Sequence, residues 1–358
     1  MKLSYTKVLA VSAVLLAGTS CDDGDEGASR INAELNSAVL IDFSSTIAQS
    51  TYSDLASKTS TLYTQVLALE TDGASDPELE ACRATWKAAR QSWEQSESFL
   101  FGPVSTDNID PRIDTWPVNF VDLDKQLNSN AEFTESYIDN LEDALKGFHP
   151  IEYLIFGENG TKTAAQLSAR DIAYLKGLAL NLKTLTNELN ESWDPLNSDN
   201  YTVKFTTAGS GNSTYPTQLS AFEEMVQAMS GICDEVANGK IGEVYTSQDP
   251  KLEESPFAKN SITDFTNNIK GVQNVYLGKY AADGKGLEDM VRSYNLQLDS
   301  DIKLKMSTAI ESLGKITVPF GEAISTQKTQ VQNAIDAIEA LHKAIDEDLL
   351  PFVQAHAN

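Results

Sequence analysis

The sequence is poor in the residues that most often carry enzyme chemistry. Histidine and cysteine each occur only three times in 358 residues. Besides Cys21, the cysteines are Cys82 and Cys233, both inside helical hydrophobic patterns, and two cysteines make no zinc framework. A disulfide between them and two buried free thiols both remain open. The sequence also lacks a His-Glu-x-x-His motif, a glycine-rich phosphate loop and a nucleophile elbow, which argues against zinc peptidases of that type, phosphate-loop enzymes and serine hydrolases.

Basic residues are also in deficit. Lysine and arginine together number 27 against 52 aspartates and glutamates, which gives a formal charge of −25. Such a surface repels phosphate backbones, so we expect no nucleic-acid partner. The balance suits a soluble protein, or one that meets cations.

The N-terminus resembles a bacterial export signal. Lys2 and Lys7 precede an apolar run that is too short to cross a bilayer and typical of a signal peptide, which we place at residues 1–20. Cys21 follows a small-residue stretch, as in a lipoprotein processing site where the cysteine is acylated; a plain signal cleavage nearby is the alternative. Residues 21–30 are acidic and predict a flexible tether. In lipoproteins of Bacteroidetes such acidic residues resemble a surface-export signal, so we expect lipid anchoring at the outer membrane, on its periplasmic face or at the cell surface.

Apolar residues recur three, four or seven positions apart through most of the remaining sequence, which predicts helix after helix. The class is therefore all-α, with two packed helical-bundle domains at 31–196 and 217–358. Between them, the alternating residues Tyr201–Phe205 predict a short β-hairpin. The proline-containing stretch from 103 to 120 predicts an ordered loop. The expected helices are ~31–71, 78–101, ~132–146, ~149–156, ~164–193, ~217–238, ~260–278, ~286–294, ~298–316 and ~322–347.

The helix at 78–101 carries charged residues on its apolar face. Arg90 and Glu97 share that face with Trp86 and Trp93. A buried charge is costly unless it is paired or coordinates something. Two interpretations remain: an internal salt bridge of Arg90 with Glu97 or with other helices, or a polar pocket inside the bundle faced by Glu97 and Glu94.

The loop that follows alternates Asp110, Arg112 and Asp114. Residues so spaced in an extended segment point the same way. They are therefore candidates for the same polar pocket, although aspartate before proline is also ordinary turn chemistry.

His149 and Glu152 lie three residues apart in the stretch GFHPIEYLIFG, residues 147–157. Pro150 favours the first position of a helix, which would make His149 the N-cap and Glu152 a capping glutamate after a Gly147 stop. The same spacing places an imidazole beside a carboxylate, a pair that suits zinc, iron or copper. Two ligands do not hold a metal ion, so further acidic residues would have to complete the set.

The Gly147-x-His149-x-x-Glu152 motif resembles the signature of the imelysin-like family, formerly grouped as M75 peptidases. Other segments are similar to family segments in the same order: Trp86 to Val104, Asp110 to Asn119 and Glu254 to Gly278. The resemblance extends from about residue 31 to residue 355.

This resemblance implies an exported, often lipid-anchored protein of two helical domains, with the motif near their junction and a link to iron acquisition. It implies a metal site of His149, Glu152, Glu97 and Asp114, with Arg112 as an orienting cation. Candidate ligand-binding residues beside this set are Glu94 from the helix pattern and, by the resemblance, Ser255, Asp264 and Asn268.

The favoured function is capture of a metal ion (iron, zinc or copper) or of an iron-bearing ligand for uptake, without bond cleavage and together with other membrane components. One alternative is a metallopeptidase in which a metal activates water and Glu152 or Glu97 acts as base. The other is a surface interaction protein whose polar cluster is structural. We assign no catalytic residue.

Overall fold

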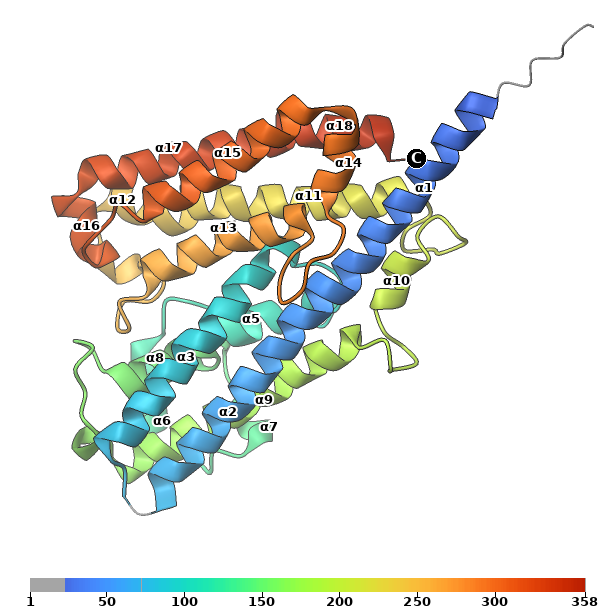
Figure 1. Cartoon of the computed structure of the whole chain (residues 1–358). Helices are drawn as coiled ribbons and strands as arrows, with labels where there is room; N and C mark the ends of the chain where they lie inside the picture. Colours follow the sequence, from blue (N-terminus) through green and yellow to red (C-terminus); the bar gives the residue numbers. More distant parts are fainter. Residues whose placement is uncertain (1–22, 72, 358) are drawn as a thin grey trace, which may run out of the picture.

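The computed structural model describes residues 23–71 and 73–357, and these residues form helices and loops without a β-sheet (Figure 1). Their only strand-like pairing is an isolated bridge between Lys279 and Asp283. The predicted all-α class is confirmed. Residues 1–20 and Cys21 lie outside the described residues. No helix within those residues has both the length and the apolar character needed to cross a membrane.

The first half of the chain contains three long helical stretches and several short helices. They are α1 (Asp23–Asp42), the π-helical η1 (Phe43–Gln49), α2 (Ser50–Thr71), α3 (Asp76–Ser96), η2 (Glu97–Phe99), α4 (Pro103–Thr106), α5 (Ile109–Asp114), α6 (Phe120–Leu127), α7 (Glu135–Asp139), η3 (Asp143–Leu145), α8 (Phe148–Phe156), η4 (Ala164–Gln166), α9 (Ala169–Trp193) and α10 (Thr202–Thr206).

The second half is built in the same way. It comprises α11 (Gln218–Asp234), the π-helical η5 (Glu235–Glu243), α12 (Val244–Ser247), η6 (Pro250–Leu252), α13 (Ser261–Leu277), α14 (Leu287–Tyr294), α15 (Leu296–Leu313), α16 (Phe320–Thr326), α17 (Lys328–Ala344), the π-helical η7 (Ile345–Leu349) and α18 (Leu350–His356).

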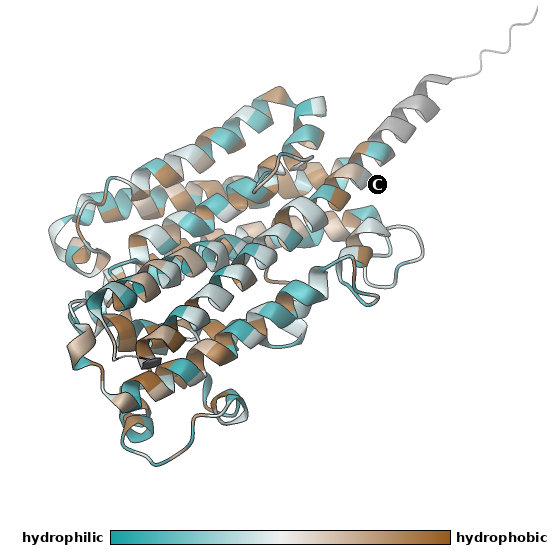
Figure 2. Ribbon diagram, turned by 60° about the horizontal axis from the view of Figure 1, so that its bottom comes forward, coloured by the Kyte–Doolittle hydropathy of each residue, from teal (hydrophilic) through white to brown (hydrophobic). Residues whose placement is uncertain are grey.

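The helices pack as two groups. In the first group α2 contacts both α3 and α9, and in the second α15 contacts both α13 and α17, as Figure 1 shows. The long helices carry both hydrophobic and hydrophilic residues along their length (Figure 2), as expected of helices with one buried face. Trp86, Trp93 and Trp193 are fully buried in the core of the first group.

Helix α3 joins the two groups because it also packs against α13. It begins at Asp76, and the Ser75 backbone N–H and hydroxyl both donate to the Glu78 carboxylate, at 3.0 and 2.7 Å. Gly271 of α13 lies so close to α3 that a Cβ atom there would stand 2.3 Å from the Gln95 carbonyl oxygen. The polar residues of α3 and α13 therefore face one another across a very short gap.

Replacing Gly271 with alanine is expected to destabilise the protein by about 2 kcal/mol, because the new methyl group must push α3 and α13 apart. Urea unfolding followed by circular dichroism measures this. Gly231→Ala is the matched control, since its Cβ would meet nothing within 4 Å in a helix, where alanine is favoured over glycine. Equal stability of the two variants would contradict the close approach.

Two local expectations are wrong. Tyr201–Phe205 forms no hairpin: residues 202–206 are the helix α10, whose Phe205 is buried against the rings of Phe43 and Trp193. The stretch 103–120 is mostly helical (α4 and α5), because Pro103 occupies a first helical turn, where proline is tolerated. Helix α1 begins at Asp23, within the stretch 21–30 that was expected to form a tether.

The structure also decides between the two states left open for the cysteines. Cys82 and Cys233 are both buried and free. Burial raises the pKa of the Cys82 thiol to about 12, so this thiol is inert at neutral pH.

Candidate metal centre

Gly147 ends the preceding segment in a conformation that only glycine adopts easily. Its φ is +82°, and a Cβ atom would lie 2.2 Å from the carbonyl oxygen of Ile113 in α5. Helix α8 begins at Phe148, so Gly147 is the N-cap and His149 is already inside the first turn. The predicted N-cap role of His149 is therefore wrong. The glycine instead allows α5 and α8 to approach, which brings Asp114 to His149.

Glu152 does not cap its own helix either. Its Oε1 atom accepts hydrogen bonds from the backbone N–H groups of Phe257 and Ala258, at 2.9 and 2.7 Å. The carboxylate is fully buried. Glu152 thus fixes the loop after η6 onto α8 and ties the second half of the chain to the first.

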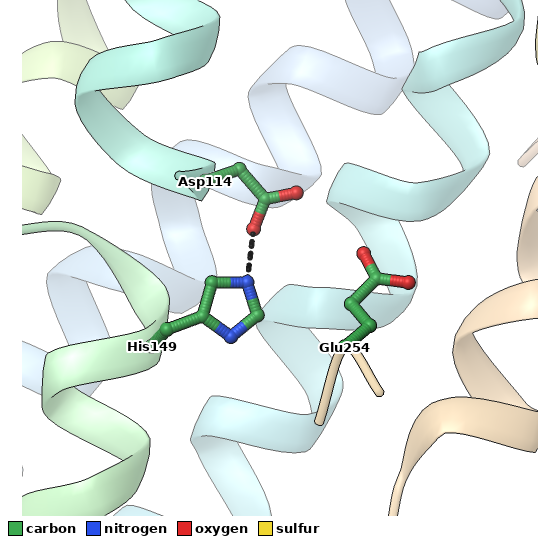
Figure 3. Close-up of side chains that lie close together, drawn as sticks. All are labelled: Asp114, His149 and Glu254. Carbon is green, nitrogen blue, oxygen red and sulfur yellow. Dashed lines mark ion pairs between the residues drawn. The ribbon is translucent and has the colours of Figure 1, made fainter. Parts of the chain in front are cut away.

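His149 lies between two carboxylates. Figure 3 shows its ring beside the first of them, Asp114, and near a third carboxylate, that of Glu254. Nε2 is 3.1 Å from Asp114 Oδ1, and Nδ1 is 3.5 Å from Glu152 Oε2. Burial alone would lower the pKa of His149, but the contacts with Asp114 and Glu152 outweigh it and raise the pKa to about 9. The imidazole therefore carries a proton at neutral pH.

Two buried cations hold the neighbouring carboxylates. Arg90 on α3 pairs with Asp114 and Glu94, and its Nη2 lies 2.8 Å from Glu254 Oε1. Lys240 Nζ lies 2.8 Å from Glu97 Oε2 and 2.9 Å from Glu254 Oε1. Lys240 belongs to the π-helical segment η5, and such segments are frequent at functional sites.

The cluster contains more acid than base. Three groups can carry positive charge: Arg90, Lys240 and His149. Six carboxylates surround them, so the fully ionised cluster would hold an excess of three negative charges; they are Glu94, Glu97, Asp114, Glu152, Glu254 and Asp264. Unbalanced buried charge is costly, and protons or bound cations must offset it.

The pKa values follow this imbalance. Burial raises the pKa of Glu97 to about 8, and Lys240 lowers it only in part. Burial also raises the pKa of Glu94 and of Asp264 well above the usual range, against the effect of Arg90. For Asp114 the balance is opposite: burial favours the neutral form, but Arg90 and His149 lower the pKa to about 2. In the metal-free protein, protons therefore neutralise part of the cluster.

Several buried polar atoms of the cluster have no hydrogen-bond partner. Each belongs to a side chain that is at most 1% exposed; they are Glu254 Oε2, Ser255 Oγ, Asp264 Oδ2, Asn268 Oδ1 and Arg90 Nε. Native structures rarely leave such atoms unpaired. Their concentration here marks the cluster as a place where water or a bound ion can supply the missing partners.

Two sets of three residues within the described part of the chain have the spacing of a metal site. In one, ligand atoms of Asp114, His149 and Glu254 lie within 4.8 Å of one another; in the other, those of Glu94, Glu254 and Asp264 do. Two residues of the first set, His149 and Glu254, line a cavity of about 20 Å³, and Glu254 belongs to the second set as well. That volume holds one water molecule or one ion.

Most of the site residues expected from the sequence lie in this cluster. The structure brings His149, Glu152, Asp114 and Glu94 together with Ser255, Asp264 and Asn268; Asn268 Nδ2 donates to Glu94 Oε2 at 2.7 Å. Glu97 pairs with Lys240 and belongs to neither set of three.

Arg112 does not reach the cluster, because its Nη2 pairs with Asp139 at 2.6 Å. The expectation assumed an extended segment, whereas α5 is helical, and residues two apart on a helix point to different sides. Arg90, and not Arg112, pairs with Asp114. Arg90 does not pair with Glu97, which pairs with Lys240 instead, but the other expected pairing, with residues outside its own helix, is confirmed by Asp114 and Glu254.

Lys240 and Glu254 were missed. For Lys240 a signal exists: it stands at a core position of a helical pattern, one turn after Val236 and one turn before Val244, both buried. Glu254 lies in a loop between two prolines, where no periodicity marks it.

Comparisons with known proteins agree with this architecture. The imelysin (peptidase M75) family model matches residues 48–347. The iron-regulated protein A of Synechococcus elongatus is 32% identical over 282 residues, which cover 77% of this chain and 75% of that protein.

Two crystal structures have the same fold. One, described as an iron-regulated protein A precursor from Parabacteroides distasonis, is 24% identical with a TM-score of 0.81 and covers 91% of this chain and 96% of its own. The other, an imelysin-like protein from Psychrobacter arcticum, is 14% identical with a TM-score of 0.73 and covers 91% and 98%.

Proposed function

The chain belongs to the imelysin family. From this premise we propose that it binds a metal ion between His149, Asp114 and Glu254, and that this binding contributes to iron acquisition. One observation carries the proposal: Oε2 of Glu254, which has no hydrogen-bond partner, and the ring of His149, whose Nε2 faces Asp114, belong to residues that line a cavity of single-ion size inside a cluster with excess negative charge. The name of the Synechococcus relative supports an iron-related role.

The geometry suits first-row metals. Two ligands about 2.1 Å from a metal and at right angles lie about 3 Å apart, and His149 Nε2 lies 3.1 Å from Asp114 Oδ1. One imidazole with carboxylates fits iron, zinc or copper better than calcium or magnesium. Glu152 faces Nδ1 of His149, so it would orient the ring and keep the Nδ1 proton while Nε2 binds the metal.

Arg90 and Lys240 hold Oε1 of Glu254 and leave Oε2 for the metal. Because His149 Nε2 is protonated at neutral pH, the metal must displace that proton. We therefore propose that the protein captures the metal ion without cleaving a bond. A metallopeptidase would need a base free to take a proton from water, whereas Glu152 already accepts two backbone hydrogen bonds and Glu97 is paired with Lys240.

Titration of iron, copper and zinc into the mature chain tests this proposal. We expect near-stoichiometric binding, weakened at least about 100-fold in Glu254→Gln and in His149→Ala. His342→Ala is the matched control, because His342 is a partly exposed histidine that pairs with Asp346. Absent binding in the wild type, or equal binding in all variants with unchanged helicity, would contradict the proposal.

We also propose that acylated Cys21 anchors the mature protein to the outer membrane. Cys21→Ser is expected to move the protein from the membrane fraction to the soluble fraction, since burial of the acyl chains supplies the anchoring energy. Fractionation followed by immunoblotting measures this. Unchanged membrane association of the serine variant would show that the anchor lies elsewhere.

A further inference from the structure

A second, larger pocket adjoins the small cavity of the metal centre. We call it the outer pocket; it has a volume of about 520 Å³ and is lined by residues that include Phe120, Asp124, Tyr153, Glu158, Lys251 and Phe257. It shares Phe120, Lys251, Pro256 and Phe257 with the small cavity. The volume lies in the usual range for small organic ligands, about 300–1,000 Å³.

Three aromatic rings from three separate segments meet in the outer pocket. The ring centroids of Phe120 (α6), Tyr153 (α8) and Phe257 (the loop after η6) are 5.0 to 5.9 Å apart, and each pair meets edge to face. Phe120 is 41% exposed, so a large apolar side chain remains open to water at this place. The arrangement offers ring faces and edges to a flat occupant.

The metal centre holds the outer pocket in shape. The Phe257 N–H donates to Glu152, and Gly160 lies against the carbonyl group of the same residue: a Cβ on Gly160 would stand 2.7 Å from the Phe257 carbonyl oxygen. The Phe257 backbone is thus fixed on both sides. Since Tyr153 directly follows Glu152, one helical turn supplies both the metal centre and the outer pocket.

The charge of the outer pocket is predominantly negative. Two carboxylates, Asp124 and Glu158, line it against a single cation, Lys251. After burial, Asp124 and Glu158 are the main causes that raise the pKa of Tyr153, which indicates a negative potential at its hydroxyl. Aromatic faces beside carboxylates favour a cationic or neutral occupant over an anionic one.

We propose that the outer pocket binds the flat aromatic part of a small metal complex that carries no net negative charge, with its metal directed into the cavity beside His149. The inference rests on the proposed metal-binding function and adds the chemistry of the ligand to it. The complex enters with its ring among Phe120, Tyr153 and Phe257 and its positive charge near Asp124 and Glu158. A free coordination position on the metal is then filled by the protein.

Calorimetric titration with three probes tests the inference: copper(II) alone, its 1:1 complex with 2,2′-bipyridine, and the flat dication N,N′-dimethyl-4,4′-bipyridinium, which cannot chelate. Phe120→Ala is expected to weaken the binding of both aromatic probes about three- to tenfold, from the loss of one ring contact. Asp124→Asn is expected to weaken them in the same direction. Copper(II) alone should bind Asp124→Asn as it binds the wild type, because Asp124 lines the outer pocket and not the small cavity.

Tyr294→Ala is the matched control, because Tyr294 is a 46% exposed aromatic residue outside both pockets. If the aromatic probes bind Phe120→Ala and Tyr294→Ala equally well, or do not bind the wild type, the inference is overturned. If copper(II) fails to bind while the flat dication binds in a Phe120-dependent way, the metal-binding function falls and the aromatic site stands.

Discussion

Arg90→Met is expected to lower the free energy of unfolding by about 3–5 kcal/mol, the usual cost of breaking a buried ion pair on one side. Arg90 is fully buried and pairs with Asp114, Glu94 and Glu254. Methionine fills much of the same volume, so the loss reports charge rather than a cavity. After the change, Lys240 and the titratable His149 are the remaining groups that can carry positive charge among the carboxylates of the cluster.

Arg112→Met is the matched control for that variant. Arg112 also pairs with an aspartate, but its side chain is 23% exposed and that of Asp139 is 41% exposed. Solvent screens such a pair, and its loss should cost less than about 1 kcal/mol. Urea unfolding of both variants gives the comparison. Equal losses would mean that the buried cluster is no more sensitive to charge than the surface.

The metal-free protein is expected to lose stability as the pH rises from about 5 to 9, by an amount on the order of several kcal/mol. The folded-state pKa of Glu97 is about 8 against an ordinary 4.5, and that of His149 is about 9 against 6.5. Both are raised, so each group contributes stability that is complete below its unfolded pKa and lost as the pH rises through the folded value. The low pKa of Asp114, about 2, acts in the opposite direction but only below about pH 4.

Melting temperatures across this pH range, with a chelator present, measure the effect. Glu97→Gln removes one of the two groups and should flatten the profile between about pH 5 and 8. A bound metal should also flatten it, because it supplies the positive charge that protons supply in its absence. A melting temperature that rises towards pH 9 in the metal-free wild type would contradict the charge imbalance of the cluster.

The sequence predicted most of the helices and the part of the metal centre that α3 and α8 contribute, for identifiable reasons. Helical periodicity marks α3 directly, and charged residues on its apolar face pointed to a buried polar cluster. The motif with His149 and Glu152 was recognised by its resemblance to a family. Its physical meaning was not, because the contact of Gly147 with Ile113 and the hydrogen bonds of Glu152 with Phe257 and Ala258 join distant segments.

The errors have a common physical origin. Arg112 was chosen on the assumption that residues 103–120 are extended, and packing made them helical. Tyr201–Phe205 alternates like a strand, but burial of Phe205 among aromatic rings selected a helix. Propensity is a weak prior at such places, and tertiary contacts override it.

X-ray diffraction from crystals grown with iron or copper, with anomalous scattering to locate the metal, tests the central claim most directly. The account predicts one strong peak about 2.0–2.3 Å from His149 Nε2 and from an oxygen of Glu254, with Asp114 beside it. A peak only at exposed carboxylates, or a fully loaded protein with His149 Nε2 still facing Asp114 alone, would contradict it. The buried cluster would then be a structural charge network, and the function would have to be sought on another surface.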